Sequence, residues 1–172
     1  MAILDLAGAN QSTVSFITNY GHRLYSDDFL VQLDHSFGDG DFYANQANPR
    51  AVEKFVSGAL DFADGSFDGA LVWDVLEFLS PALLATVVAR LRGVLRPGAC
   101  LLAVFHADER AETVPSYSYR IHDHRTIQMV SRGRRRPAQI FNNRSLEKLF
   151  QDFHSVKFFL TRNHLRELIV RR

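Results

Sequence analysis

Short apolar runs alternate with helical segments along the first 106 residues, and this alternation restricts the fold more than any other feature of the chain. The runs 2–6 and 99–105 are typical of strands that are buried on both faces of a sheet, and 67–73 is a strong strand candidate. Ser80-Pro81 opens a helix whose apolar residues recur at helical spacing as far as Val94. Strands and helices in alternation form a parallel sheet covered by helices. We therefore expect a three-layer α/β/α fold.

Weaker patterns complete the expected order of elements. Helices are predicted at 12–20 and from Pro49 to about Ser57, and a second strand is predicted at 22–26. A third strand at 58–62 rests on a weak apolar pattern, and residues 34–48 have no clean period and are expected to be mostly loop. The sheet would then contain about six to seven strands, most of them parallel.

The pattern changes in the last third of the chain. Residues 119–130 are typical of a hairpin or two short strands, and the arginine-rich run 132–136 is expected to be a loop. The chain is expected to close with a helix at 143–153 and strands at 156–160 and 165–170. Two strands joined so tightly cannot run parallel, so the C-terminal strand should be antiparallel.

The composition is that of an ordinary globular protein. With 172 residues the chain is long enough for one core and short of the usual size for two domains. No apolar run approaches the ~20 residues that cross a bilayer, and no basic segment precedes the first apolar residues as in a signal peptide. The single Cys100 excludes an intrachain disulfide and fits a reducing compartment. We expect one soluble, cytoplasmic domain.

The two parts of the chain carry opposite charge. Residues 1–100 hold 12 acidic and 6 basic side chains, whereas residues 101–172 hold 7 acidic and 14 basic ones. Much of the positive charge lies in the run 132–136, which is most simply a solvated loop. Alternatively, Arg134 and Arg135 anchor a phosphate or carboxylate of a substrate, or the run binds nucleic acid.

Ligands of open α/β sheets bind beyond the carboxyl ends of the strands. Applied to the predicted strands, this rule selects the segments 5–10, 27–28, 59–62, 73–74 and 105–106. In the first of these, small side chains allow the backbone to approach a ligand closely, and free N–H groups of the following helix can bind an anion.

An acid stands at the end of the second predicted strand. Asp27 lies 19 residues after Gly8, a spacing typical of a carboxylate that accepts hydrogen bonds from ribose hydroxyls. Turn and acid together indicate a ligand that contains a nucleoside; alternatively, Asp5 and Asp27 only cap turns. The turn is not the G-x-G-x-x-G of dinucleotide-binding folds, because Gly8 is its only glycine, and this disfavours NAD or FAD.

Three segments resemble class I methyltransferases that use S-adenosylmethionine (SAM), of the methyltransferase type 11-like group. Ile3-Leu4-Asp5-Leu6-Ala7-Gly8-Ala9-Asn10 is similar to the family's first motif, usually apolar-Asp-apolar-Gly-x-Gly-x-Gly. Residues 62–79, FADGSFDGALVWDVLEFL, resemble the segment around its fourth strand. Residues 91–102, LRGVLRPGACLL, resemble the stretch before its fifth strand, with a Leu-x-Pro-Gly-Gly turn. Residues 158–162 near the end of the chain also fit the family's last two strands, although they are not diagnostic of it.

The resemblance implies one domain over residues 1–172 with a Rossmann-like sheet of seven strands, the last antiparallel. Residues 1–106 would form the cofactor-binding half, and residues 107–172 would form a substrate-side insert and the C-terminal strand pair. The implied activity is methyl transfer from SAM, without a metal, to a small molecule, which would be anionic if Arg134 and Arg135 bind it.

The resemblance also implies roles for the strand ends. Ala7-Gly8-Ala9 would contact the methionine part of SAM, with Asp5 supporting this turn. Asp27 would hold the ribose hydroxyls, with Asp28 as the alternative. Ala59-Leu60-Asp61 would lie by the adenine.

The remaining strand ends would serve the reaction. Trp73 and Asp74 would border the methyl group and the substrate, and Asp74 or His106 would act as the base for an oxygen nucleophile. Alternatively, Trp73 belongs to the core and His106 is only a hydrogen-bonded histidine. His122 and His124 would share one face of a strand, but no third metal ligand is evident, so we expect exposed hairpin histidines and no metal.

The sequence departs from the family pattern in two places. Alanine and Gln11 stand where the first motif usually has glycine, and the resemblance begins at the first strand without the family's upstream helices. We therefore expect a further segment, a partner chain or self-association of the chain to cover the cofactor site. A non-catalytic interaction domain with the same fold is the second interpretation, and a nucleic-acid-binding module that uses the run 132–136 is the third.

Overall fold

The computed structural model describes residues 1–161 and 163–172. Arg162, the last residue of the C-terminal segment that resembles the family, lies outside the described residues. Among the described residues, no helix combines the length and the apolar character needed to cross a membrane.

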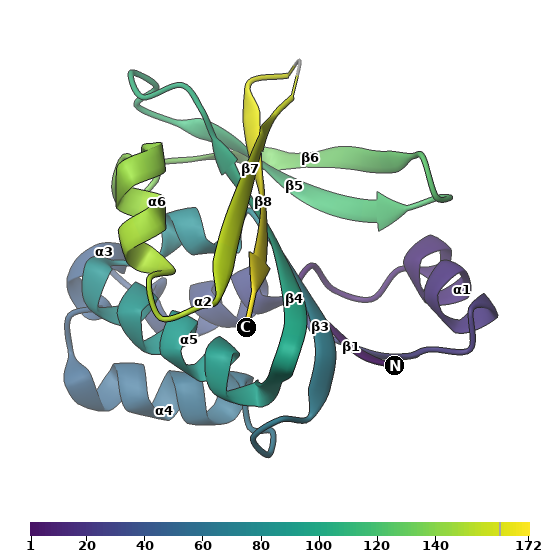
Figure 1. Cartoon of the computed structure of the whole chain (residues 1–172). Helices are drawn as coiled ribbons and strands as arrows, with labels where there is room; N and C mark the ends of the chain where they lie inside the picture. Colours follow the sequence, from purple (N-terminus) through teal and green to yellow (C-terminus); the bar gives the residue numbers. More distant parts are fainter. Residues whose placement is uncertain (162) are drawn as a thin grey trace.

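Six strands form the main sheet in the order β2-β1-β3-β4-β8-β7 (Figure 1). Their bounds are β1 Ala2–Asp5, β2 Arg23–Ser26, β3 Phe67–Trp73, β4 Leu95–His106, β7 Ser155–Leu160 and β8 Leu165–Arg171. The first four are parallel, and β8 runs antiparallel to both of its neighbours. The predicted mostly parallel sheet with an antiparallel C-terminal strand is therefore confirmed.

Helices cover the two faces of this sheet unequally. Their bounds are α1 Gln11–Asn19, α2 Phe29–Phe37, α3 Phe42–Asn45, α4 Pro49–Ala59, the 3₁₀-helix η1 Val75–Phe78, α5 Pro81–Val94 and α6 Asn143–Leu149. Residues of α2, α4, α5 and α6 form the main core with one face of the sheet. The other face carries α1 and a two-stranded antiparallel ribbon, the hairpin of β5 Val114–Ile121 and β6 Ile127–Arg135.

Helix starts follow the capping signals of the sequence. Asn48-Pro49 and Ser80-Pro81 open α4 and α5, with the Asn and Ser side chains accepting from N–H groups of the first turn. Asn10 and Asp28 cap α1 and α2 in the same way, five residues after the end of β1 and two residues after the end of β2. The chain therefore turns from strand to helix at the carboxyl edge of the sheet, where its candidate site residues stand.

Three expectations about local structure were wrong. Residues 58–62 form no strand, because α4 continues to Ala59 and buries Val52, Phe55 and Val56 on one side, so the sheet has six strands. Residues 34–48 hold the end of α2 and all of α3, which the Asp41 side chain caps. The run 132–136 is not a loop, because its backbone pairs with β5 as far as residue 135.

Cys100 lies on the face of the sheet that carries α1 and the hairpin, and its exposure shows that these elements cover only part of that face. In β4, Leu101, Ala103 and Phe105 are fully buried against the helices, whereas Cys100 points to the other face and is exposed. Only part of that face lies beneath α1 and the hairpin, which together bury a smaller cluster of apolar residues. The expectation of a strand buried along both faces therefore fails at Cys100.

Candidate functional site at the carboxyl edge of the sheet

A buried carboxylate holds the turn after β1. Asp5 Oδ1 accepts a hydrogen bond from Ala7 N at 3.1 Å, and Oδ2 accepts one from Ser26 Oγ at 3.2 Å. Burial raises the pKa of Asp5, and hydrogen bonds from the Trp73 indole and Ala7 oppose this rise. Gly8 then adopts a φ of +85°, a conformation that residues with a Cβ rarely adopt.

The acids that follow β2 lie beside this turn, because β1 and β2 pair in parallel. Asp27 is exposed, and its carboxylate accepts hydrogen bonds from Asp28 N at 2.8 Å and from the Gln32 side chain. Gly8 N donates to the Asp27 carbonyl oxygen at 3.1 Å. The structure thus brings together the glycine turn and the acid that the sequence singled out.

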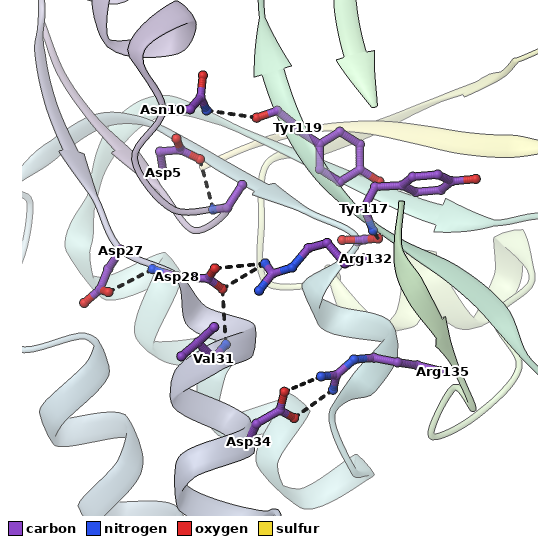
Figure 2. A network of polar contacts seen from close by, with 12 residues as sticks. Asp5, Asn10, Asp27, Asp28, Val31, Asp34, Tyr117, Tyr119, Arg132 and Arg135 are labelled. Atoms are coloured by element: carbon purple, nitrogen blue, oxygen red, sulfur yellow. Dashed lines mark hydrogen bonds and ion pairs between the residues drawn. The ribbon is translucent and has the colours of Figure 1, made fainter. Parts of the chain in front are cut away.

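Asp28 lies close to Gly8 and is paired with Arg132 of the hairpin, as Figure 2 shows for the pair. A Cβ added to Gly8 would lie 3.2 Å from both Cβ and Oδ2 of Asp28. Arg132 of β6 reaches over from the hairpin and places Nη1 2.9 Å from Asp28 Oδ2. Arg135, also on β6, pairs with Asp34 of α2. Two ion pairs therefore join the hairpin to α2 across the edge where a ligand is expected.

Trp73 lies inside the molecule rather than on a ligand surface. It ends β3 with a φ of 58° and is 1% exposed. Its Nε1 donates to Asp5 Oδ1 at 2.7 Å, and its ring stacks on Tyr119 with centroids 4.5 Å apart. A non-glycine residue held in the left-handed region is strained and occurs often at functional sites. The indole packs between the sheet and the hairpin, which agrees with the core interpretation.

Asp74 follows β3 and His106 ends the neighbouring β4, and Glu77 of η1 contacts His106 and lies near Asp74. Glu77 Oε1 accepts from His106 N, and Oε2 contacts His106 Nδ1, both at 2.6 Å. Asp74 Oδ2 accepts from Tyr117 N at 3.2 Å. Burial, with Glu77 nearby, raises the pKa of Asp74 to about 7. Two buried carboxylates and an imidazole thus form an acid–base cluster, which we call the 74/77/106 cluster.

Two tyrosines of β5 cover the 74/77/106 cluster. The Tyr117 ring lies 6.2 Å from the His106 ring and 6.1 Å from that of Tyr119, measured between centroids. Burial and the Asp74 carboxylate raise the pKa of the Tyr119 hydroxyl. Neither Tyr119 Oη nor His106 Nε2 has a hydrogen-bond partner among the described residues. Buried polar atoms of this kind, beside acid–base groups, are typical of an active site.

Solved methyltransferases share this arrangement of strands and helices. A SAM-dependent methyltransferase from Archaeoglobus fulgidus superposes with a TM-score of 0.58 at 10% identity, over 99% of this chain and 86% of that one. One from Methanosarcina mazei gives 0.54 at 18% identity, over 99% and 91%. The 1,6-didemethyltoxoflavin-N1-methyltransferase of Burkholderia thailandensis, solved with S-adenosylhomocysteine, gives 0.54 at 14%, over 99% and 70%. This chain has the class I methyltransferase fold.

The likeness to methyltransferases lies in structure and not in overall sequence. No protein-family model matches the chain, and no curated protein matches it significantly. The fold therefore indicates at which edge of the sheet a ligand site is expected, but it does not identify the residues of that site.

The predicted adenine contacts are misplaced for a methyltransferase fold. Ala59 ends α4, and Leu60 and Asp61 follow it, where the helix has run back to the amino edge of the sheet before β3 begins. There the Leu60 carbonyl accepts from Arg90 Nε at 3.2 Å, near the end of α5. The sequence assignment fails because a helix occupies the segment that was taken for the third strand. The three residues lie at the opposite edge from Gly8.

The arginines of β6 are engaged within the molecule. Arg134 Nε donates to Thr113 Oγ1 at 3.0 Å. Arg135 pairs with Asp34 and lies 5.8 Å from the centre of the Phe78 ring. These contacts weaken the interpretation of the run 132–136 as a free anion-binding or nucleic-acid-binding loop.

No metal site accompanies the methyltransferase fold in the described part of the chain. No group of three His, Cys, Asp or Glu side chains is placed to hold an ion there. His122 and His124 are exposed beside the turn that joins β5 to β6.

A cavity of about 720 Å³ borders the methyltransferase-like edge of the sheet. It is lined by the segments 109–113 and 136–140, which follow β4 and β6. Ala138 N donates to the Glu77 carbonyl oxygen at 2.8 Å, so the second segment rests on η1. The cavity therefore lies beside η1, the element that carries Glu77.

Sequence reasoning did not assign Glu77, Tyr117 or Tyr119 to the cofactor site or the catalytic site. Glu77 stands three residues after Asp74, within one helical turn, and this spacing could have suggested a shared face. Tyr117 and Tyr119 are two apart on one strand and so point the same way. Their position over β3 and β4 depends on how the hairpin folds back, which no local pattern indicates.

Proposed function

We propose that the chain is a SAM-dependent methyltransferase that acts on a small molecule in the cytoplasm. One observation carries the proposal: the carboxyl edge of a methyltransferase-like sheet combines the Gly8 turn, the exposed Asp27 and the buried 74/77/106 cluster. Two neighbouring folds belong to N-methyltransferases, of 1,6-didemethyltoxoflavin and of a glycopeptide, which supports transfer to a heteroatom.

The residues at this edge fit a nucleoside ligand in two respects. Asp27 presents an exposed carboxylate, as a partner for ribose hydroxyls requires. The Gly8 turn lacks a side chain at the position of closest approach, and Asp5 holds Ala7 in place behind it. The Arg132 side chain would have to leave Asp28 for a ligand to reach Gly8.

The chemistry divides between the ligand and the protein. Bound SAM supplies a methyl group that is already activated as a sulfonium, so the protein mainly aligns the acceptor. His106 or Asp74 would take the proton that the acceptor loses. Burial keeps Asp74 close to half ionised at neutral pH, because its pKa lies at about 7.

Internal contacts occupy the carboxyl edge of the sheet, and they favour a second candidate, a non-catalytic domain with a methyltransferase fold. Gly8 N is bonded to the Asp27 carbonyl, and Arg132 covers Asp28 beside it. A domain that had lost its cofactor would have no need to keep this space open. The two candidates differ in one measurable property, which is affinity for the cofactor.

Calorimetric titration with SAM and with S-adenosylhomocysteine tests the proposal. The wild-type chain should bind both, and Asp27→Ala should bind at least about tenfold more weakly, since a hydrogen bond to a charged group contributes about 1.5–3 kcal/mol. Asp61→Ala is the matched control, because Asp61 is an exposed acid at the opposite edge of the sheet.

Binding of neither ligand by the folded wild-type chain would reject the methyltransferase and favour the non-catalytic domain. Equal losses in Asp27→Ala and Asp61→Ala would reject the ribose assignment alone. Methyl transfer to any acceptor would exclude the second candidate.

A further inference from the structure

Buried polar atoms without partners mark one place in the molecule. Among the described residues, His106 Nε2, Ser116 Oγ and Tyr119 Oη have no hydrogen-bond partner. Tyr119 is 2% exposed, and the His106 side chain is nine-tenths buried. Each such atom costs about 1–3 kcal/mol if it stays unsatisfied. His106 and Tyr119 both belong to the surroundings of Asp74, so a ligand that satisfies them has a defined location.

Glu77 fixes which atom of His106 is free. Its two carboxylate oxygens reach the His106 backbone N–H and the ring Nδ1, both at 2.6 Å. An ionised carboxylate can only accept, so Nδ1 must carry a hydrogen. In a neutral imidazole the other nitrogen then has a free lone pair. Glu77 therefore leaves His106 Nε2 as an acceptor.

The surroundings of Nε2 disfavour an anion. Asp74 and Glu77 contribute two buried carboxyl groups, and the Tyr119 hydroxyl lies close enough to both for their charges to raise its pKa. The basic side chains of Arg132 and Arg135 are paired with Asp28, the N-cap of α2, and with Asp34 of α2. Like charges brought together in a buried site repel strongly. The rings of Trp73, Tyr117 and Tyr119 complete an aromatic wall.

We propose that Glu77 is a positioning residue that holds His106 with Nε2 as the proton acceptor, and that the methyl acceptor is therefore an aromatic hydroxyl or amine rather than a carboxylate. This inference rests on the proposed methyltransferase function. It replaces the anionic substrate expected from Arg134 and Arg135 with a neutral hydrogen-bond donor.

The reaction balances without a further reagent. The oxygen or nitrogen of the acceptor forms a bond to the methyl carbon while the carbon–sulfur bond of SAM breaks. The proton of the acceptor passes to His106 Nε2, and the electron pair of the broken bond stays on sulfur. The Glu77 carboxylate stabilises the imidazolium that results, as an acid does behind a catalytic histidine.

Nitrogen-15 NMR of the imidazole tests the role of Glu77. In the folded chain the neutral imidazole of His106 should carry its hydrogen on Nδ1 and leave Nε2 without one. Glu77→Gln, which keeps the size of the side chain, should lose this single tautomer and give a mixture. Protonation at Nε2 in the wild-type chain would overturn the proposal, and this outcome does not depend on whether Glu77→Gln folds.

Three probes that share a phenyl ring and differ in their substituent test the acceptor class. Phenol, aniline and benzoate are titrated into the chain saturated with S-adenosylhomocysteine, with the His106 resonances as the readout. Phenol or aniline should bind at least about tenfold more tightly than benzoate, and His106→Gln should abolish this preference. Tighter binding of benzoate, or equal binding of all three, would overturn the inference. Failure of S-adenosylhomocysteine itself to bind would instead reject the proposed function.

Discussion

At the scale of single residues, Asp5 explains why the ends of three strands, β1, β2 and β3, meet in one place. Its fully buried carboxylate joins β1 to the turn through Ala7, to β2 through Ser26 and to β3 through the Trp73 indole. Sequence reasoning placed Asp5 behind the turn because of the motif around it. It could not foresee Trp73 as a partner, since that contact spans 68 residues.

The close approach of Gly8 to Asp28 has a measurable cost when a side chain is added. Gly8→Ala should lower the free energy of unfolding by about 2–3 kcal/mol, because a left-handed φ costs about 1–2 kcal/mol and the new Cβ adds a clash. Gly40→Ala is the matched control, since Gly40 has a φ of +84° but nothing within 4 Å of a Cβ. Urea unfolding measures both, and equal losses would refute the clash.

Asp74 should make stability depend on pH. Its pKa is raised to about 7 in the folded chain, so the folded state holds a proton that the unfolded state has released. Stability contributed by this group is complete below pH ~4 and is lost as the pH rises to about 7, by up to about 4 kcal/mol at about 1.4 kcal/mol per pH unit.

Asp74→Asn should flatten that dependence and be more stable than the wild type at pH 8. Urea unfolding between pH 4 and 8 provides the comparison, with Asp61→Asn as a variant of an exposed acid that should follow the wild type. A wild-type stability that rises over this range would contradict the assignment to Asp74, whose charged neighbours are Glu77 and His106.

At the scale of elements, the helix and the strand with the strongest sequence patterns were predicted well, and the strand with the weakest pattern was not. Strand β3 and helix α5 lie where the apolar periodicity of 67–73 and 81–94 placed them. The strand expected at 58–62 failed because Gly58, Ala59 and Leu60 also suit the end of an amphipathic helix. Short apolar runs of this kind do not distinguish a strand from a helix end.

The hairpin is the element whose place the sequence could not give. Its strands were expected near 119–130, but its docking over β3 depends on contacts such as Tyr119 on Trp73 and Arg132 on Asp28. These join residues 46 and 104 positions apart, respectively. Long-range contacts between polar and aromatic groups leave no periodic signal along the chain.

Freeing Asp28 from the hairpin should strengthen cofactor binding. Arg132→Ala should bind S-adenosylhomocysteine up to about fivefold more tightly, because a partly exposed ion pair that competes with the ligand is worth about 0.2–1 kcal/mol. Arg134→Ala removes the same charge but only loses contacts to Thr113, and should not change the affinity. Weaker binding by Arg132→Ala would show that Arg132 contacts the ligand rather than excluding it.

At the scale of the whole molecule, the two faces of one sheet are covered by unlike layers. Helices α2, α4, α5 and α6 cover one face together with η1, while α1 and the hairpin share the other and leave Cys100 exposed. The sequence indicated helices on both faces, and it could not tell how many, because burial of alternate strand residues looks the same from either side. The site therefore lies where a sheet and a ribbon meet.

Trp73 has a practical consequence, because it is the only tryptophan of the chain. Its indole touches Asp5 on one side and Tyr119 of the hairpin on the other, and it is shielded from water. Any movement that lifts the ribbon from the sheet would hydrate this single chromophore and shift its emission to longer wavelength. The protein thus contains a built-in optical reporter of its own opening, readable in a cuvette without an attached dye.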